Sequence, residues 1–401
     1  MRSILDAALA RFILLFAFLY AAFGVHSPFF PSFLSARGLE PEAIGVVLAA
    51  GTAIRLVAAP LAGRIADRFD ASRAVLAASI AAAALLALGY LGAWGFWPLL
   101  LMSFASAVAL APVAPVADAL ALGAAERRDG NGRKAFDYGW VRGAGSAAFI
   151  AGSLLSGQAI ARFDLTVIVV LQAGLLAIAT LFAVRMPQQP LRAPDEDPCS
   201  SGDPPRSAHG IRRLLAIPLY RRVILVAALV FGSHAMHDGF AVIRWREAGI
   251  GPELISLLWS ESVAAEVVVF FLIGRPLLDR LGPGRAAAFC AGAGLLRWII
   301  MAQTAWLPAL MLVQPLHGFT FALLHLACMR ILSHIVPSGL AATALTLYGT
   351  LGAGVSSVLL TLASGPLYGR LGPAGFWVMA GLCAFAMPLA LTLNRRPKSR
   401  S

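Results

Sequence analysis

The feature that most constrains this chain is a series of long apolar segments. Each is longer than the about 18 residues that mark a membrane-spanning helix. Lipid offers no water to bond the backbone N–H and C=O groups, so each segment must be helical. We therefore predict an all-α integral membrane protein with twelve spans, near residues 8–30, 42–63, 73–93, 97–124, 140–161, 165–185, 219–243, 254–274, 285–305, 307–333, 340–364 and 373–393.

Composition supports a membrane protein over a soluble one. Only 13% of the 401 residues are charged and 59% are hydrophobic, whereas soluble domains carry about 25% charged residues. A large soluble protein with buried helices is the alternative, but this chain has too few polar residues to cover such a core. The lipid bilayer is therefore the expected partner.

The distribution of basic residues predicts the orientation. Of the 32 lysines and arginines, 24 fall in segments on the side of the N-terminus and five in segments on the other side. Cytoplasmic loops carry the excess of Lys and Arg, so we expect both termini in the cytoplasm. The same bias explains the net charge of +12 without nucleic acid as a partner.

A charged turn recurs in the two halves of the chain and indicates an internal repeat. Asp67, Arg68 and Arg73 reappear 212 residues later at three positions, Asp279, Arg280 and Arg285. Such repeats are typical of secondary transporters, whose substrate site lies near the bilayer midplane between the halves. We predict two pseudo-symmetric six-helix bundles, residues 1–188 and 216–401, joined by a polar, proline-rich cytoplasmic linker at 189–215.

Charged residues near the middle of a span are the candidate functional groups, because burying a charge in the membrane costs several kcal/mol. Glu266 and Arg297 fall near mid-membrane in the eighth and ninth spans. Desolvation and a nearby arginine act in opposite directions on a carboxyl group, so a conformational change can load and release a proton there. We predict proton coupling by Glu266 and Arg297 with His325 and Asp238; a static pair that locks two helices is the alternative.

Arg55 is the candidate anchor for an anionic substrate. Its planar fork can bind a carboxylate through two parallel hydrogen bonds, and aromatic neighbours can stack on a ring. Pairing of Arg55 with an acid in its own half is the alternative. The other predicted substrate contacts are polar or aromatic residues of the spans: Tyr20, His26, His234, His237, Trp259, Gln314, His317 and Tyr348.

The seventh span carries Ser233, His234, His237 and Asp238 close together. Residues four apart share a helix face, which pairs His234 with Asp238 or Ser233 with His237. A proton relay or substrate contact, satisfied polar packing and, with weak spacing, a metal site all remain open from the sequence.

Charged groups near the predicted cytoplasmic ends are candidate gates. Asp118 and Arg330 fall at corresponding depths in the two halves, and we expect them to face each other across the pseudo-two-fold axis; capping of their own helix ends is the alternative. The remaining predicted gate residues are those of the repeated turn, Asp67, Arg68, Arg73, Asp279, Arg280 and Arg285, together with Arg142.

No nucleotide-binding, nucleophile or metal motif is present in the sequence, so we predict no cofactor, no metal and no enzymatic activity. Four cysteines, at 199, 290, 328 and 383, have neither metal-ligand nor redox spacing, which indicates packing residues without a disulfide. An integral-membrane enzyme is a distant alternative.

The turn at residues 63–73 resembles the signature loop between the second and third helices of the major facilitator superfamily. Further stretches resemble the phenylpropionate-permease type of proton symporter within it: residues 137–142, 233–235, 258–259, 265–267, 296–298, 317–321 and 325–327. The resemblance implies a monomeric multi-pass protein of the bacterial cytoplasmic (inner) membrane that imports a small organic acid, such as an aromatic acid, with protons. A sugar or nucleoside symporter and a drug exporter are the alternatives of the same fold.

Overall fold

The structure is a computed structural model that describes residues 2–126, 135–186, 207–337 and 339–394. The described residues form helices and connecting turns, with no strand among them. The chain divides into two compact units, one of Met1–Pro198 with Gly251–Leu257 and the other of Cys199–Ile250 with Leu258–Ser401. Most of the predicted linker, and Cys199 with it, lies outside the described residues.

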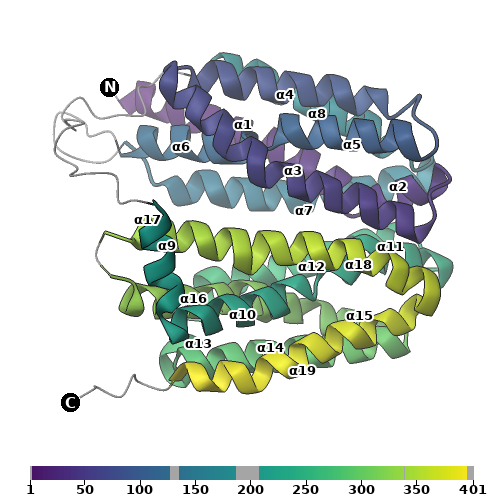
Figure 1. Ribbon diagram of the computed structural model, residues 1–401. Helices are drawn as coiled ribbons and strands as arrows, with labels where there is room; N and C mark the ends of the chain where they lie inside the picture. Colours follow the sequence, from purple (N-terminus) through teal and green to yellow (C-terminus); the bar gives the residue numbers. More distant parts are fainter. Residues whose placement is uncertain (1, 127–134, 187–206, 338, 395–401) are drawn as a thin grey trace. The chain divides into compact units, whose positions relative to one another are not determined.

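The helices of the first unit run side by side (Figure 1). In chain order they are α1 (Arg2–His26), α2 (Phe30–Ala36), α3 (Pro41–Arg68), α4 (Ser72–Gly89), α5 (Phe96–Leu110), α6 (Val113–Ala125), α7 (Tyr138–Arg162) and α8 (Val167–Val184). Buried apolar side chains of α1, α4, α6 and α8 form its core.

Glycines allow α1 and α7 to pack backbone to backbone. A Cβ atom at Gly24 of α1 would collide with the backbone of Phe149 on α7, and one at Gly152 of α7 would collide with the backbone of Ala21 on α1. Small residues at helix contacts are a usual device of membrane proteins, where apolar burial alone does not drive helices together.

The second unit contains the remaining helices, except for the start of α12 as far as Leu257, which belongs to the first unit. They are α9 (Ser207–Ala216), α10 (Pro218–Gly232), α11 (Ala235–Glu247), α12 (Pro252–Val268), α13 (Gly274–Leu281), α14 (Pro283–Gln303), α15 (Leu307–Val313), α16 (Leu324–Ile335), α17 (Ala341–Leu347), α18 (Ser356–Leu371) and α19 (Phe376–Leu391). Its core joins α10, α14, α16 and α19 through small and branched side chains and the buried cysteines Cys290 and Cys328.

Within the described residues, eleven helical stretches are long and apolar enough to cross a membrane, and the last of them, Ala341–Asn394, has 54 residues. At about 1.5 Å per residue such a stretch is far longer than one bilayer crossing. It is interrupted by a short 3-10 turn at Gly372–Gly375, where Gly372 has a φ of +54°, and the chain reverses between α18 and α19 (Figure 1). Counted as two spans, this stretch brings the described helices to the twelve predicted spans.

Several predicted spans contain a break that the apolar pattern did not reveal. The fourth is divided at Pro112 between α5 and α6, and the seventh between Gly232 and Ala235. The tenth contains a 3-10 turn at Gln314–Leu316 and a π-helix at Phe319–Leu323. Proline lacks the N–H that a continuous helix needs, and Pro315 lies in this turn. These breaks bring Gln314 and His317 toward the interior of the second unit.

Large apolar side chains remain exposed on both units, among them Leu85 at 72%, Leu101 at 61% and Leu312 at 75%. A soluble protein rarely leaves so much apolar surface open, whereas lipid covers it without cost. The outer surfaces therefore agree with a membrane-spanning chain.

Candidate functional site

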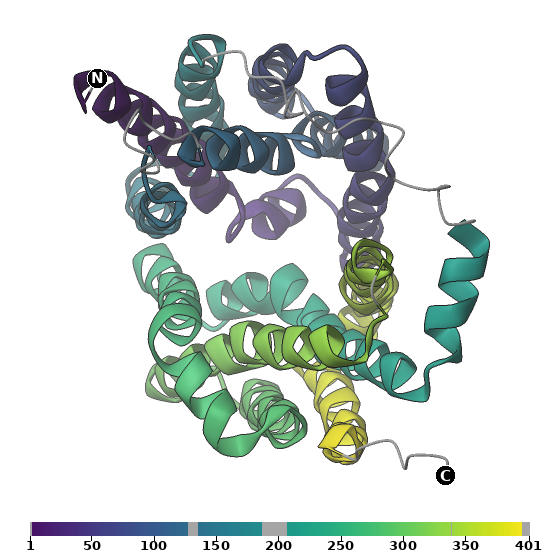
Figure 2. The same ribbon diagram turned by 90° about the vertical axis from the view of Figure 1, so that its left-hand side faces the viewer.

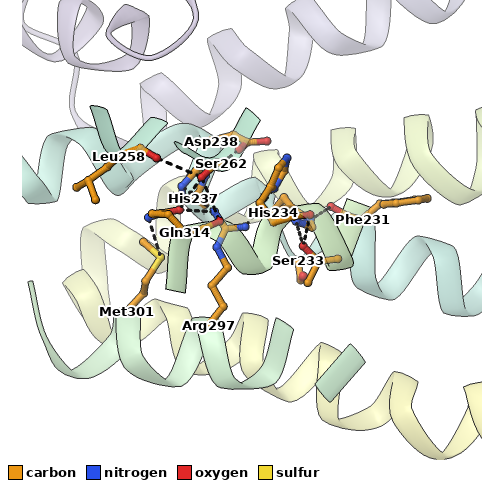
Figure 3. A network of polar contacts seen from close by, with 12 residues as sticks. Phe231, Ser233, His234, His237, Asp238, Leu258, Ser262, Arg297, Met301 and Gln314 are labelled. Atoms are coloured by element: carbon orange, nitrogen blue, oxygen red, sulfur yellow. Dashed lines mark hydrogen bonds and ion pairs between the residues drawn. The ribbon is translucent and has the colours of Figure 1, made fainter. Parts of the chain in front are cut away.

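A polar network fills the interior of the second unit (Figure 3). Its centre is Arg297 of α14, whose side chain is completely buried. A buried charge requires a full set of partners, because leaving it unpaired costs several kcal/mol. The residues around Arg297 come from α11, α12 and the broken tenth span.

Arg297 contacts three acceptors with its two terminal nitrogens. One nitrogen donates to Gln314 Oε1 at 2.6 Å and lies 3.2 Å from His237 Nε2, and the other lies 3.2 Å from His317 Nδ1. Arginine has no acceptor atoms, so both histidine nitrogens must accept from it. Arg297 therefore fixes the tautomers of His237 and His317 and keeps both rings neutral.

The free nitrogen of each histidine points to a carboxylate. His237 carries its proton on Nδ1, which lies 3.1 Å from Asp238 Oδ1. His317 carries its proton on Nε2, which lies 3.6 Å from Glu266 Oε2. The guanidinium is thus the hub of two branches, each consisting of one neutral histidine and one carboxylate, and we call this arrangement the Arg297 fork.

The carboxylates are more accessible than the hub. The side chain of Asp238 is 61% exposed and that of Glu266 is 27% exposed. Counted by themselves, with both histidines neutral and both carboxylates ionised, these five side chains carry one more negative than positive charge. Binding of one proton would make them neutral.

Buried polar side chains support the fork from two sides. Ser262 of α12 donates to Gln314 Oε1 at 3.0 Å, so the amide that faces Arg297 is itself held in place. On the other side, His234 Nε2 lies 3.0 Å from Thr320 Oγ1, and its ring packs edge-on against the ring of His317 at 5.2 Å. The fork is therefore a fixed constellation with few open rotamers.

Trp298 follows Arg297 and belongs to the same shell. Its indole N–H donates to Ser233 Oγ at 2.9 Å, and Ser233 donates to the backbone oxygen of Val230. Trp298 is also completely buried, and the guanidinium carbon of Arg297 lies 4.6 Å from its ring centre. This aromatic wall excludes water from one side of the hub.

Two expected pairings can be compared with the observed contacts. Glu266 and Arg297 were expected to form a pair, and the ring of His317 connects them, with Nδ1 3.2 Å from the Arg297 guanidinium and Nε2 3.6 Å from Glu266 Oε2. His234 and Asp238 keep the helical register of residues four apart, because the Asp238 backbone N–H donates to the His234 carbonyl oxygen at 2.9 Å. The Asp238 carboxylate itself lies 3.1 Å from Nδ1 of the adjacent His237.

The other predicted residues of the second unit lie around the fork or apart from it. Trp259 of α12 stacks on His237 with ring centres 5.0 Å apart. His325 of α16 and Tyr348 form a separate contact, with Tyr348 Oη 3.4 Å from His325 Nδ1. Glu266 is within electrostatic range of His325, which links the two groups.

In the first unit, a cation and aromatic rings come together on α1 and α7. The Arg142 guanidinium donates to the hydroxyl of Tyr20 and lies 4.9 Å from the centre of its ring. Tyr20 also stacks on Phe16 and meets Phe23 edge-on. Arg142, predicted as a gate residue, thus lies in an arrangement that suits an aromatic anion.

Arg55 lies on α3 with an exposed side chain. It is within electrostatic range of His26 and Tyr90. The ring of His26 stacks on Phe30 at 4.2 Å. An exposed guanidinium beside aromatic groups remains available to a solute, unlike the buried Arg297.

Several of the predicted gate residues contact groups of their own unit. Asp118 of α6 accepts a hydrogen bond from the Tyr138 hydroxyl at 2.7 Å, and Arg330 of α16 pairs with Asp279 of α13 at 2.5 Å. Arg73 donates to the backbone oxygen of Met186 at 3.4 Å. The remaining gate residues are exposed near helix ends: Asp67, Arg68, Arg280 and Arg285.

Sequence reasoning named Ser233 but did not select Ser262, Trp298 or Thr320 as members of the site. Two of them follow a simple spacing signal, because Ser262 precedes Glu266 by four residues and Thr320 follows His317 by three. Such residues share a helix face with a functional group. Uncharged hydroxyl side chains are common in membrane spans, so this spacing alone does not identify site residues.

Each unit exposes apolar helices of the kind that cross a membrane, and the second unit encloses a buried ionisable network, as expected of a multi-pass membrane transporter. A sequence-family model described as the MFS_1-like family matches residues 9–379, and the chain belongs to this family. It is a secondary transporter of the major facilitator type and not an enzyme.

Relatives agree with this class. The chain is 33% identical over 375 residues to a protein of Escherichia coli (strain K12) described as "Probable 3-phenylpropionic acid transporter", covering 92% of this chain and 93% of that protein. It is 24% identical to a maltose permease of Geobacillus stearothermophilus, covering 95% and 93%.

Solved structures share the fold. The crystal structure of the nucleoside transporter NupG matches with a TM-score of 0.80 at 16% identity, covering 96% of this chain and 98% of that one. A bacterial homologue of the human lysosomal transporter Spinster matches with a TM-score of 0.73 at 13% identity, covering 97% and 96%.

Proposed function

We propose that the protein is a proton-coupled symporter that imports a small aromatic acid of the phenylpropionate type. The observation that carries the coupling is the Arg297 fork, in which one buried guanidinium is connected through two neutral histidines to two carboxylates. The substrate class is supported by the relative that is 33% identical over nearly the whole chain.

The charge of the fork supplies a physical reason for coupling. Enclosing a net charge away from water costs several kcal/mol, whereas a neutral group of hydrogen-bonded charges is far cheaper to enclose. The fork becomes neutral when one carboxylate binds a proton. Alternating access then proceeds readily with a proton bound, and the transporter moves proton and substrate together.

Glu266 is the proposed site of the coupled proton, and Asp238 is the more open carboxylate through which the fork contacts solvent. Their side chains are 27% and 61% exposed. His237 and His317 connect the two carboxylates to Arg297, so a change of charge at either carboxylate changes the electrostatic environment of the guanidinium. His325 lies within electrostatic range of Glu266 and is the proposed next group on the route.

Substrate recognition is assigned to the first unit. Arg297 has no exposed surface, so it cannot meet the carboxylate of a substrate directly. Arg55 is exposed, and Arg142 combines a cation with the ring of Tyr20. A planar guanidinium binds a carboxylate, and aromatic rings bind the phenyl group.

The remaining parts of the proposal concern placement. We assign the protein to the bacterial cytoplasmic membrane as a monomer with both termini in the cytoplasm, which the excess of Lys and Arg in those segments supports. The exposed turn residues and the Asp279–Arg330 pair would then lie at the cytoplasmic side.

The test uses purified protein in proteoliposomes with an inward proton gradient. We expect accumulation of labelled 3-phenylpropionate, with alkalinisation of the external medium, and no accumulation of maltose or uridine. Uptake of maltose or uridine instead would contradict the proposed substrate class. Accumulation of 3-phenylpropionate that does not depend on the proton gradient would contradict the symport mechanism.

Substitution separates coupling from binding. Glu266→Gln should abolish accumulation driven by protons while leaving exchange of internal for external substrate largely intact. Glu261→Gln, five residues away on the same helix, is the matched control and should retain accumulation. If Glu266→Gln still concentrates substrate, the assigned coupling role is wrong.

The anchor is tested in the same way. Arg55→Lys and Arg142→Lys keep the charge and remove the fork-shaped donor. A large rise of KM for organic anions in one of them identifies the anchor, and an unchanged KM in both removes the assignment to the first unit.

A further inference from the structure

Helix α9 lies across the ends of the spans of its own unit instead of along them (Figure 1). The helix is 10 residues long, and a single residue, Ile217, separates it from Pro218, where the next apolar span begins. Ile217 is extended, with ψ 112°, because a residue before proline avoids the helical conformation. The chain therefore turns sharply at the boundary of a span, which places α9 at the membrane surface.

Side chains of α9 anchor it to the second unit on one face. Leu214 is completely buried in the core of that unit, and Gly210, one turn earlier, approaches Leu340 closely. In the view along the spans, α9 lies at the margin of its unit (Figure 2). It is thus held at the margin of its unit, beside the start of the span that follows it.

The other faces of α9 are apolar and basic. At about 100° per residue, Ile211 and Leu215 form a flank next to the anchored face, and Arg212 and Arg213 lie beyond it. Leu215 is 36% exposed, and both arginines are exposed. An apolar flank beside a basic one is the pattern of a helix that lies in the membrane interface.

Two more arginines extend the basic flank. Arg221 and Arg222 lie in the first turns of α10 and are exposed. Together with Arg212 and Arg213 they place four positive charges within eleven residues around the turn at Ile217, and the described part of this segment contains no acidic residue.

We propose that α9 and the start of α10 form a binding surface for anionic phospholipid headgroups. A lipid phosphate meets the arginines while the acyl region meets Leu215, and an anionic bilayer offers both at the depth where the span begins. Nucleic acid would satisfy the charges but not the apolar flank. The surface is independent of the proposed substrate and of proton coupling.

The experiment measures lipid binding by the full-length protein. Native mass spectrometry counts phosphatidylglycerol molecules retained by the protein in detergent, with phosphatidylcholine as the neutral reference. Each arginine that meets a bound anionic headgroup contributes about a fivefold change in affinity, so Arg212→Gln with Arg213→Gln should weaken phosphatidylglycerol binding at this surface about 25-fold.

Two control variants test whether the loss of binding is specific to the positive charges of Arg212 and Arg213. Arg185→Gln with Arg275→Gln removes two other exposed arginines and should leave the retained phosphatidylglycerol within about fivefold of the unmodified protein. Arg212→Lys with Arg213→Lys keeps the charge and should retain most of the binding.

A second measurement follows the helix itself. Hydrogen–deuterium exchange of the peptide covering α9 should slow when phosphatidylglycerol is added to nanodiscs of phosphatidylcholine, and it should respond much less in the double glutamine variant. Equal lipid retention or equal protection in the unmodified protein and that variant overturns the proposal.

Discussion

Replacing Arg297 by lysine keeps a positive charge in the centre of the second unit but removes the shape of the donor. The guanidinium uses two nitrogens to reach Gln314, His237 and His317. An ammonium has only one nitrogen. If it took the place of the nitrogen that serves Gln314 and His237, His317 Nδ1 would lose its donor.

The magnitude follows from that lost contact. A hydrogen bond to a charged group contributes about 1.5–3 kcal/mol, and a buried acceptor left unpaired adds to the loss. We expect Arg297→Lys to lower the free energy of unfolding by about 1.5–3 kcal/mol. Loss of the hydrogen bond would also leave His317 Nδ1 open to a proton, so the pH profile of uptake should shift relative to that of the unmodified protein.

Unfolding can be followed with a thiol-reactive dye, because Cys290, Cys328 and Cys383 are buried and react only when the second unit opens. The pH profile of uptake in proteoliposomes supplies the second reading. A shift of the profile distinguishes control of the histidines from a purely structural role of Arg297.

Arg244→Lys is the matched control. Arg244 is 7% exposed, and among the described residues its NH1 atom is buried without a hydrogen-bond partner. Arg244→Lys should therefore lower the free energy of unfolding less than Arg297→Lys does. Equal loss of stability in the two variants, or an unchanged pH profile for Arg297→Lys, would refute the reasoning.

Three further outcomes are expected. Gly24→Ala forces a methyl group against the backbone of Phe149 and should lower stability by about 1–3 kcal/mol in thermal unfolding. Asp279→Asn breaks the pair with Arg330, but both side chains are more than a third exposed, so its loss should stay below about 1 kcal/mol and vanish in high salt. Asp238→Asn keeps an oxygen acceptor for His237 but removes one negative charge from the fork, so stability should hold while proton uptake with substrate, measured in weakly buffered medium, falls.

Each of these three predictions has its own control or its own contradicting result. A Cβ atom at Gly63 would meet no atom within 4 Å, so Gly63→Ala should not lower stability. If Gly24→Ala lowered stability no more than Gly63→Ala does, the close packing of α1 on α7 would be contradicted. A loss well above about 1 kcal/mol for Asp279→Asn would contradict a surface pair. Unchanged proton uptake in Asp238→Asn would show that the charge of the fork does not govern coupling.

The relation between sequence and site is clear at Arg297. Its depth in an apolar segment predicted a functional group, because a charge there needs partners, and the same reasoning selected Glu266 and the histidines. Their actual connections were not predictable. The direction of each side chain depends on the breaks at Gly232–Ala235 and Gln314–Leu316, which the apolar pattern does not reveal.

The helix α9 is a second feature that the sequence pattern did not predict. Its residues fall in a stretch that composition marks as a linker, rich in proline and charge. Only burial of Leu214 in the core of the second unit gives this short segment a reason to be helical, since isolated helices of such length are marginal in water.

By itself the sequence determined the class of the protein, the helical spans and the depth of the charged residues. A bilayer leaves the backbone no alternative to internal hydrogen bonding, so length and apolarity are sufficient for these. The tertiary structure decided which donor meets which acceptor, and hence that Arg297 holds two neutral histidines against two carboxylates. Hydrogen bonds depend on distances of about 3 Å between residues far apart in the chain, and only packing sets such distances.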